Sequence, residues 1–316
     1  MRSDLDHLPE TVRADIAAIL RIIFTEFEDT IGRATQGWKR AGRVMKVLLH
    51  GEHARGAASP EETSVTMAGP TSQGADTPPK SYEIMLVVND KRLAEAQYWT
   101  HTRDHLIREH AIMGRLSAPV ELAVFTMTGI NSRLSGGKPY FVDAVSRGLV
   151  LYELPGEPFA APKRLAANEF REQARRLVDS TFPRAASFLR MARFAHGEGM
   201  SNQAAFNLHQ TAEHAYHTLL LAHLLYSPST HRIDWMRERA EAAVPSIGSV
   251  WGTNDAFSRR CFRLLDDAYV KTRYAPSYAI REDELVWLFE RIEALVAQVE
   301  LLVRQRLLLP SSRIAK

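Results

Sequence analysis

Residues 201–224 read SNQAAFNLHQTAEHAYHTLLLAHL, and their pattern is that of one long amphipathic helix. Small and apolar residues recur at alternating spacings of four and three, which places them along one side of the helix. These residues are Leu208, Ala212, Ala215, Leu219 and Ala222. Helical periodicity also covers residues 168–196, 229–242, 254–272 and 282–309. We therefore predict an all-α antiparallel helical bundle over residues 164–316.

The first half of the chain mixes strand and helix patterns. Short apolar runs that end in turn residues predict strands at 45–50, 82–88, 120–127 and 149–153. Helical spacing predicts helices at 8–31, 91–116 and 140–146. Strands separated by helices indicate an α+β or α/β domain with about four strands over residues 1–155, and we assign the chain to the α+β class.

Two segments of loop composition divide these regions. Residues 57–81 are rich in Gly, Pro, Ser and Thr, and we interpret them as a flexible insertion because they offer little apolar surface to bury. Pro158 and Pro162 lie in a second such segment, which predicts a linker at residues 156–163.

The overall composition is that of a globular protein, with 45% hydrophobic and 24% charged residues. No apolar run approaches the ~20 residues of a membrane span, and the acidic first ten residues argue against a secretory signal. The single cysteine, Cys261, excludes a disulfide framework. We therefore expect a cytoplasmic protein without a membrane partner.

Charge is distributed unevenly along the chain. Residues 163–316 carry 22 Lys and Arg against 17 Asp and Glu, whereas residues 1–162 carry 18 against 20. The basic surplus could help to hold a polyanion, but it is small, and an ordinary solvated surface is the commoner explanation of such a surplus.

Three segments of the first half carry a resemblance to a known family. Residues 47–56 read VLLHGEHARG, residues 81–88 read SYEIMLVV, and residues 138–152 read KPYFVDAVSRGLVLY. In this order they resemble a minimal nucleotidyltransferase of the polymerase-beta-like superfamily. The resemblance implies a mixed sheet with flanking helices. It also implies a nucleotide-binding turn made by Gly51, Glu52, Arg55 and Gly56.

The residues at the catalytic positions depart from that family. Nucleotidyl transfer uses a pair of Mg²⁺ ions held by three carboxylates, and here the three positions are taken by Ser81, Glu83 and Glu121. Ser81 is neutral, and Glu52 replaces a serine that would donate to the triphosphate. We expect a silent or impaired transferase. In one alternative Glu83 and Glu121 still bind Mg²⁺ and support some transfer, and in another Glu83 is a solvent-facing residue at a strand end.

Two segments of the second half resemble a HEPN domain, which bacterial proteins fuse to such transferases. They are 208–213, LHQTAE, and 267–274, DAYVKTRY. HEPN ribonucleases place a His four to six residues after an Arg that holds the scissile phosphate. Here Arg273 is followed by Tyr278 at that position, so RNA binding can survive where cleavage does not. Alternatively, Arg273 caps the C-terminus of its helix. The resemblance further implies a homodimer, for which the apolar seam of residues 208–222 would supply the surface.

Three polar residues in the 201–224 helix share one face. His209, Glu213 and His217 are spaced at i, i+4 and i+8. Such a set could bind zinc, but a polar bundle face or a subunit interface is the commoner arrangement.

Three functions remain open from the sequence. The first is a nucleotide- or RNA-binding pseudo-enzyme that needs no cofactor. The second is an active nucleotidyltransferase that uses Mg²⁺ to modify a small-molecule or protein hydroxyl. The third is a HEPN ribonuclease of toxin–antitoxin type. DNA is not an expected partner in any of them.

Overall fold

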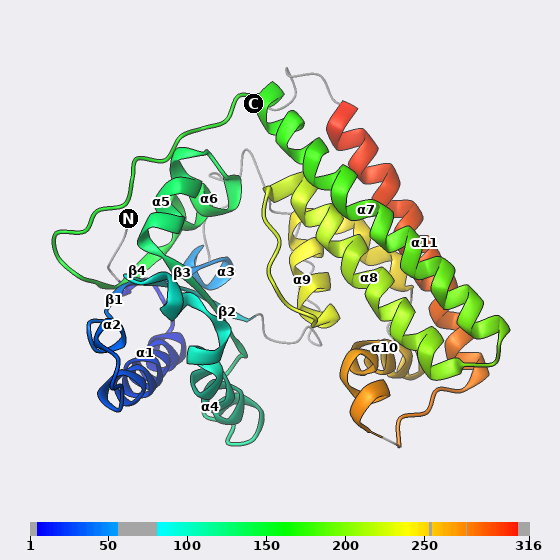
Figure 1. Cartoon of the computed structure of the whole chain (residues 1–316), viewed down its shortest axis with the longest axis horizontal. Coiled ribbons are helices and arrows are strands. Elements are labelled where there is room, and N and C mark those ends of the chain that lie inside the picture. The colour runs from blue at the N-terminus through cyan, green and yellow to red at the C-terminus, as the bar shows by residue number, and fades with distance from the viewer. Residues whose placement is uncertain (1–4, 56–80, 253–254, 276, 309–316) are drawn as a thin grey trace. The chain divides into compact units, whose positions relative to one another are not determined.

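A computed structural model describes residues 5–55, 81–252, 255–275 and 277–308 (Figure 1). The chain divides into two compact units, which we call the N-terminal unit, up to residue 165, and the C-terminal unit, from residue 166 onward. The predicted flexible insertion lies outside the described residues except for Ser81, and so does Gly56 of the predicted nucleotide-binding turn.

The N-terminal unit contains a four-stranded mixed sheet (Figure 1). Its strands are β1 (Val44–His50), β2 (Tyr82–Val88), β3 (Val120–Thr126) and β4 (Leu149–Glu153), in the order β3-β2-β1-β4. β1 pairs antiparallel with both β2 and β4, whereas β2 pairs parallel with β3. The two central strands are mostly apolar, and every residue in them except the half-buried Glu83 is buried. The mixed sheet expected from the sequence is therefore confirmed.

Helices complete the core of this unit. They are α1 (Glu10–Gly32), α2 (Gly37–Arg40), α3 (Glu52–Arg55), α4 (Thr100–Ala111), α5 (Met127–Ser135) and α6 (Pro139–Arg147). α1 packs against α4 and buries Ile16, Ile19 and Ile23 at the spacing of one helix face. Asp15 on α1 is also buried, and it accepts hydrogen bonds from the Tyr82 and Ser117 hydroxyls.

Two helix predictions in this unit need correction. Residues 91–116 do not form one helix: two 3-10 turns, η2 (Lys91–Ala94) and η3 (Ala96–Trp99), precede α4. The Asp90 side chain accepts from the Arg92 amide and so starts a separate short turn, and the extended backbone of Glu95 ends it. α5 is not among the helices predicted from the sequence, and it begins where the Thr126 side chain accepts from the Gly129 amide.

The C-terminal unit is all helical (Figure 1). It contains α7 (Ala167–Gly197), α8 (Ser201–Leu224), α9 (Ile233–Ala243), the 3-10 helix η4 (Pro245–Trp251), α10 (Ala256–Tyr274) and α11 (Glu282–Leu308). α8 packs against each of the other four α-helices. Alanines such as Ala192 on α7 and Ala204 on α8 are fully buried, and their small side chains let the helices approach closely. The predicted helical bundle is confirmed.

The apolar seam of α8 belongs to the interior of this bundle. Leu208, Ala212, Ala215, Leu219 and Ala222 are each 0% exposed. The prediction that this seam supplies a dimer surface is therefore wrong, because the chain's own helices already cover it. The homodimer itself stays a prediction.

A sharp reversal follows α8. Leu225 adopts the left-handed conformation, with φ 51°, and is the one non-glycine residue with positive φ in the described part of the chain. Its amide donates to the Leu221 carbonyl and closes the helix. The following loop then runs back beside α8, because His231 at its end contacts Glu213 in the middle of that helix.

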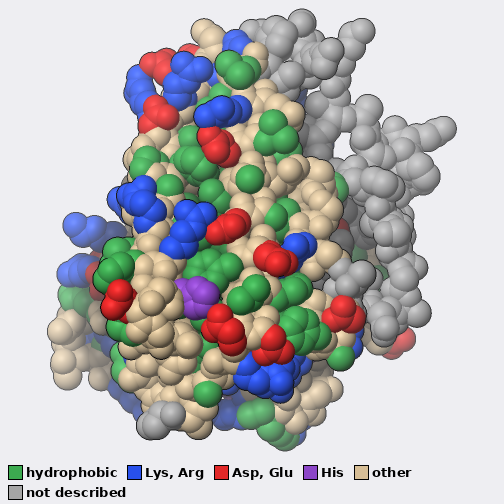
Figure 2. Space-filling model, turned by 90° about the vertical axis from the view of Figure 1, so that its right-hand side faces the viewer, with side chains coloured by type: hydrophobic (Ala, Val, Ile, Leu, Met, Phe, Trp, Pro, Cys, Tyr) green, Lys and Arg blue, Asp and Glu red, His purple; other side chains and the backbone are tan. Residues whose placement is uncertain are grey.

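The face of the molecule seen in Figure 2, on the side of α7 and α11, mixes hydrophobic side chains with acidic and basic ones. Neither sign of charge dominates this face. The basic surplus of residues 163–316 is therefore not concentrated there.

None of the helices that the structure describes is both long and apolar enough to cross a membrane.

Candidate functional site

Three of the residues expected at the transferase site, Ser81, Glu83 and Glu121, lie at the same end of the neighbouring strands β2 and β3. Glu83 is paired with His50 on the antiparallel neighbour β1 and with Glu121 on the parallel neighbour β3. Ser81 directly precedes β2 and is 7% exposed. The sequence expectation that Glu121 lies on a strand next to Glu83 agrees with this register.

The carboxylate of Glu83 is turned toward the protein rather than toward solvent. Its side chain is 12% exposed, and its Oε2 lies 3.1 Å from Nδ1 of His50. Gly51 follows at φ +76°, and a Cβ at that position would lie 2.3 Å from Glu83 Oε1. The alternative in which Glu83 is a solvent-facing residue is therefore wrong, and the turn needs glycine both for its φ and for this close approach.

His50 links this carboxylate to an aromatic layer that the sequence analysis did not identify. Its Nε2 lies 3.3 Å from the Tyr140 hydroxyl at the start of α6, and the two rings meet edge to face. Phe141 packs edge to face on both Tyr140 and Phe125. The only hint in the sequence is that Tyr140 lies inside the segment 138–152.

These residues are a poor fit for a pair of Mg²⁺ ions. Ser81 carries no charge, and the Glu83 carboxylate already lies against His50. Glu52 is exposed at the start of α3, where its charge opposes a triphosphate. Among the residues that the structure describes, no group of three or more His, Cys, Asp or Glu side chains is arranged to hold a metal ion. No step through a metal follows from this geometry.

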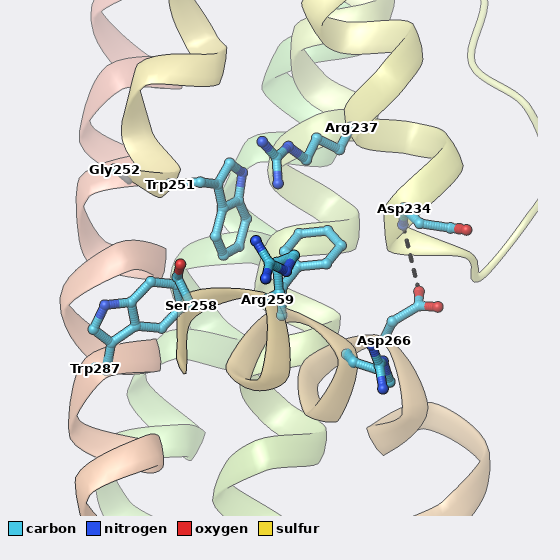
Figure 3. A pocket seen from close by; sticks show the side chains of 10 residues that line it. Asp234, Arg237, Trp251, Gly252, Ser258, Arg259, Asp266 and Trp287 are labelled. Carbon is cyan, nitrogen blue, oxygen red and sulfur yellow. Dashed lines mark hydrogen bonds between the residues drawn. The ribbon is translucent and has the colours of Figure 1, made fainter. Parts of the chain in front are cut away.

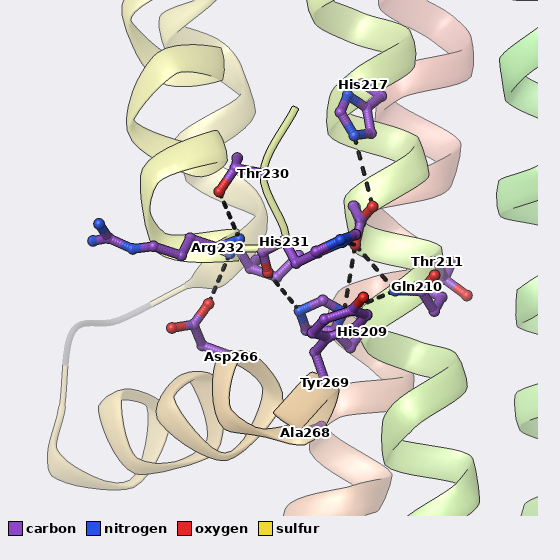
Figure 4. A network of polar contacts seen from close by, with 12 residues as sticks. His209, Gln210, Thr211, His217, Thr230, His231, Arg232, Asp266, Ala268 and Tyr269 are labelled. Carbon is purple, nitrogen blue, oxygen red and sulfur yellow. Dashed lines mark hydrogen bonds and ion pairs between the residues drawn. The ribbon is translucent and has the colours of Figure 1, made fainter. Parts of the chain in front are cut away.

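A second polar site lies in the C-terminal unit, and we call it the Glu213 cluster. Its centre is Glu213 on α8. Figure 4 labels the members around it, which are His209, Gln210 and His217 on α8, His231 before α9 and Tyr269 on α10. Glu213 is 5% exposed, and its Oε2 lies 3.0 Å from His231 Nδ1. Gln210 donates to the same oxygen over 3.0 Å. The carboxylate therefore organises side chains from α8 and from the loop before α9.

The charge of Glu213 is stabilised by its neighbours. Burial alone would raise the pKa of this carboxyl, but hydrogen bonds from His217 and His231 outweigh it and hold the pKa at about 2. His209 behaves in the opposite way, because burial lowers the pKa of its imidazole to about 4. Its Nε2 donates to the His231 carbonyl over 2.9 Å, as suits a neutral ring. The cluster therefore combines an ionised carboxylate with a neutral buried imidazole.

The exposed side of this cluster is a stack built on Tyr269. The His231 ring lies 4.0 Å from the Tyr269 ring at an interplanar angle of 18°, and its side chain is 54% exposed. The Arg273 guanidinium carbon lies 4.3 Å from the same ring centroid. The Arg273 guanidinium and the His231 imidazole therefore both contact the Tyr269 ring.

Arg273 is held by its own helix. Its Nε donates to the Tyr269 carbonyl over 2.9 Å, one turn earlier on α10, while the residue remains exposed. This carbonyl lies inside the helix, before the last turn, so the contact is not the C-terminal cap that the sequence left open; it fixes the guanidinium over an aromatic ring.

Tyr278 has a structural position. It is 6% exposed, and its hydroxyl donates to the Leu264 carbonyl over 2.9 Å. Burial raises the pKa of this phenol above its ordinary value. The structure therefore places Tyr278 in the core of the bundle, whereas Arg273 lies at the surface.

A polar network, not a metal site, is what the described side chains of His209, Glu213 and His217 form. His217 Nδ1 lies 2.5 Å from the Ser227 hydroxyl, and its Nε2 lies 3.7 Å from Glu213. No cluster able to hold a metal is found among the described side chains. The interpretation of these residues as a polar face is therefore favoured over zinc.

His231 and Tyr269 are the functional candidates that sequence reasoning missed. His231 lies 18 positions after Glu213, so no helical spacing connects the two residues. The usable signal was that His231 is the last histidine of the chain and follows the 201–224 helix after a short loop.

The C-terminal unit is similar to a known family of domains. The family model of the HEPN domain matches residues 178–302, a range that includes Glu213, His231, Tyr269 and Arg273. No curated protein matches the chain.

Proposed function

We propose that this protein binds single-stranded RNA through the surface that Arg273, Tyr269 and His231 share, since all three residues lie within the range 178–302 that matches the family model of the HEPN domain. The observation that carries the proposal is the placement of a guanidinium and an imidazole against one tyrosine ring. A guanidinium recognises phosphate oxygens, and exposed flat rings receive unpaired bases. This combination suits a single strand better than a duplex, whose bases are stacked internally.

We further propose that the N-terminal unit does not transfer nucleotides. This part of the proposal is supported by the neutral Ser81 and by the Glu83 carboxylate, which lies against His50 and the Gly51 turn. An active transferase would need these groups to hold cations instead. The alternative, transfer to a small-molecule or protein hydroxyl with Mg²⁺, makes the opposite prediction.

Arg273→Ala is predicted to weaken RNA binding by about tenfold or more, because a charge-assisted hydrogen bond contributes roughly 1.5–3 kcal/mol. The measurement is fluorescence anisotropy of a labelled single-stranded RNA titrated with the full chain. Arg190→Ala is the matched control, since Arg190 is an exposed arginine on α7 that bonds only locally to Ser187 in the described contacts.

Two outcomes would contradict the proposal. If both variants bind RNA as the unmodified protein does, Arg273 is not the phosphate contact. If labelled nucleoside triphosphates leave label on an acceptor, and Glu83→Gln abolishes the labelling, the N-terminal unit is an active transferase.

A second candidate function, RNA cleavage, is favoured by the pairing of His231 with Glu213. His231 Nδ1 faces the ionised carboxylate at 3.0 Å, so we assign the proton to Nδ1 and the free electron pair to Nε2. A carboxylate that orients an imidazole in this way is the arrangement of general-base catalysis. This histidine would take the role that the sequence pattern leaves to Tyr278.

The chemistry needs no group beyond RNA, His231, Arg273 and water. His231 Nε2 would accept the proton of a ribose 2′-hydroxyl as that oxygen bonds to the adjacent phosphorus. The bond from phosphorus to the 5′-oxygen breaks, and this oxygen takes a proton from water. The hydroxide that remains takes the proton from His231 and so restores the free base. The products are a 2′,3′-cyclic phosphate and a 5′-hydroxyl, and Arg273 would stabilise the charge on the phosphoryl oxygens.

His231→Ala is predicted to lower the cleavage rate by roughly 10²–10⁴-fold, the usual contribution of a general base. The measurement is gel analysis of end-labelled RNA, with His101→Ala as the control because His101 is an exposed histidine of the N-terminal unit. Glu213→Gln should shift the pH dependence of the remaining rate. If His231→Ala cleaves as fast as His101→Ala, His231 is not the general base; if the unmodified protein leaves the RNA intact, cleavage is not its function.

A further inference from the structure

The charges of the pocket among α9, α10, α11 and the end of η4 are largely compensated by the protein itself. This pocket has a volume of about 320 Å³ and is lined by arginines, aspartates and aromatic side chains (Figure 3). Arg237 forms an ion pair with Glu241 at 2.6 Å, and its guanidinium lies over the Trp251 ring. Asp266 accepts from the backbone amide of Ile233 over 2.7 Å. A less compensated group of charges lies in the N-terminal unit.

The stretch of chain before β1 and the stretch after β2 lie side by side, at the end of these strands opposite to the expected transferase site. The register of the two antiparallel strands pairs Val44 with Val88 at this end. The Asn89 side chain joins the two stretches, because it accepts from the Arg43 amide over 2.8 Å and donates to the Ala41 carbonyl over 3.0 Å. Residues that are far apart in the sequence therefore share one small surface.

Five cationic side chains lie on these two stretches, and we call them the α2–η2 patch. They are Lys39, Arg40, Arg43, Lys91 and Arg92. Residues 1–162 carry 18 Lys and Arg against 20 Asp and Glu, so this part of the chain is slightly acidic as a whole. The patch therefore concentrates positive charge within a region of negative overall balance, and such a concentration attracts anions.

Two aromatic rings hold part of the patch in place. Trp38 and Tyr98 meet edge to face, with ring centroids 5.9 Å apart, and both pack against the core of the unit. The Arg92 guanidinium carbon lies 3.9 Å from the Trp38 centroid, and Lys39 Nζ lies 4.9 Å from the Tyr98 centroid. Because these cations are already positioned, they lose less conformational entropy when they bind a ligand.

Acidic side chains compensate only part of the patch. Asp90 accepts from Arg92 Nε over 2.9 Å and from a terminal nitrogen of the same guanidinium over 2.6 Å, and these hydrogen bonds hold the pKa of Asp90 at about 2. Glu95 follows η2 and adds a second, exposed carboxylate. Among the ion pairs of the described residues, none includes Arg40 or Lys91, and both side chains are exposed. These two charges are therefore available to an anion.

The chemistry of the patch suits a phosphate backbone better than a protein or a membrane. Lys and Arg contacts to phosphates position a nucleic acid without reading its bases. The Trp38 and Tyr98 rings face the core and their cations, so they offer little surface to lipid tails or to stacked bases. The centre of a protein interface is typically apolar and poor in lysine, which this patch is not.

From the meeting of these two cationic stretches we propose that the α2–η2 patch binds the phosphate backbone of RNA and gives the protein a second RNA-contacting surface, on the N-terminal unit. The proposal takes the identity of the polyanion from the RNA-binding function proposed above, and in that respect it rests on that function. The surface around Arg273 would hold bases and a phosphate, and the patch would add attraction that does not depend on the base sequence.

The experiment measures the RNA affinity of the Arg40→Ala/Lys91→Ala double variant of the full chain by fluorescence anisotropy over a series of salt concentrations. We expect an affinity about fivefold lower at low salt, because two exposed charge contacts are lost. The slope of log affinity against log salt should decrease in magnitude by about 0.7 for each lost phosphate contact. Arg21→Ala/Arg108→Ala is the matched control, since it removes two exposed arginines of the same unit, on α1 and α4, and it should keep the slope.

A second variant guards against an effect on folding. Lys91→Gln removes one charge, keeps a polar side chain and should produce about half of the change in slope, with the midpoint of denaturant unfolding unchanged. The proposal is overturned if Arg40→Ala/Lys91→Ala and its control bind RNA with equal affinity and equal salt dependence.

The outcome for Arg273→Ala separates this proposal from the proposed function. If only Arg273→Ala weakens RNA binding, the RNA-binding function stands and the α2–η2 patch is not part of it. If only Arg40→Ala/Lys91→Ala weakens it, the patch binds RNA and the surface around Arg273 does not. If the unmodified protein binds no RNA, both proposals are overturned.

Discussion

Trp251→Ala should destabilise the C-terminal unit by about 3–5 kcal/mol, the usual cost of removing a buried indole. Trp251 is 3% exposed, and its N–H donates to the Tyr216 hydroxyl over 2.7 Å. Tyr216 is itself fully buried, and burial raises the pKa of its phenol above the ordinary value. The substitution therefore opens a cavity and also removes the donor from a buried hydroxyl.

Native-state hydrogen exchange on the full chain measures this effect for each unit separately. Peptides from α8 and α10 should lose protection in Trp251→Ala, while peptides from β1 and β2 serve as an internal reference and should be unchanged. Tyr216→Phe is the matched variant, because it keeps the ring and leaves only the indole N–H without its acceptor, at about 1–3 kcal/mol. Unchanged protection of α8 in Trp251→Ala would contradict the structural role assigned to this residue.

Mild acid is the second condition expected to destabilise the C-terminal unit. Burial lowers the pKa of His209 to about 4, whereas an unfolded histidine titrates at about 6.5. Between these values the unfolded chain binds a proton that the folded chain does not, so stability decreases as the pH falls from about 6.5 to 4. The difference corresponds to about 3 kcal/mol for this residue.

Two other residues of α8, His223 and Glu213, also make the folded state less stable as the pH falls. Burial also lowers the pKa of His223 to about 4, which adds to the loss in the same pH range. Hydrogen bonds from His217 and His231, which outweigh the effect of burial, hold the pKa of Glu213 at about 2. The stabilisation from this carboxylate is therefore complete above about pH 4.5 and is lost as the pH falls from there toward 2.

Denaturant unfolding at a series of pH values between 7.5 and 4 tests this prediction. His209→Gln keeps hydrogen-bonding capacity but does not titrate, so its stability should vary less steeply with pH than that of the unmodified protein. The quantity compared is the slope of the unfolding free energy against pH, because the substitution itself changes the absolute free energy of unfolding. Parallel slopes would show that His209 is not protonated on unfolding.

The sheet was predictable because its central strands obey a simple rule. β1 and β2 are buried on both faces, so their sequences are short, almost unbroken apolar runs. The bounds predicted for β2 match those of the structure. The helix predicted at 91–116 failed for a local reason, since Asp90 and Glu95 set backbone geometry through capping and extended conformations that periodicity does not register.

The candidate sites were predictable only where their residues are close in sequence. The spacing of His209, Glu213 and His217 was visible because one helix carries all three residues. His231 joins them through a tertiary contact, and the pairing of Glu83 with His50 depends on the strand register. The α2–η2 patch joins two stretches of chain that only the pairing of β1 with β2 brings together.

The reversal at Leu225 fixes the length of the loop that leads to His231, because the loop must return to Glu213 on α8. Leu225 is held in a conformation that costs a non-glycine residue about 1 kcal/mol, and it sets the point from which the chain returns to Glu213. One added or missing residue before His231 would detach the imidazole from both Glu213 and Tyr269 and leave every helix of the bundle intact. Insertions and deletions in this short connection would therefore disturb the surface proposed to hold RNA without altering the helices that carry it.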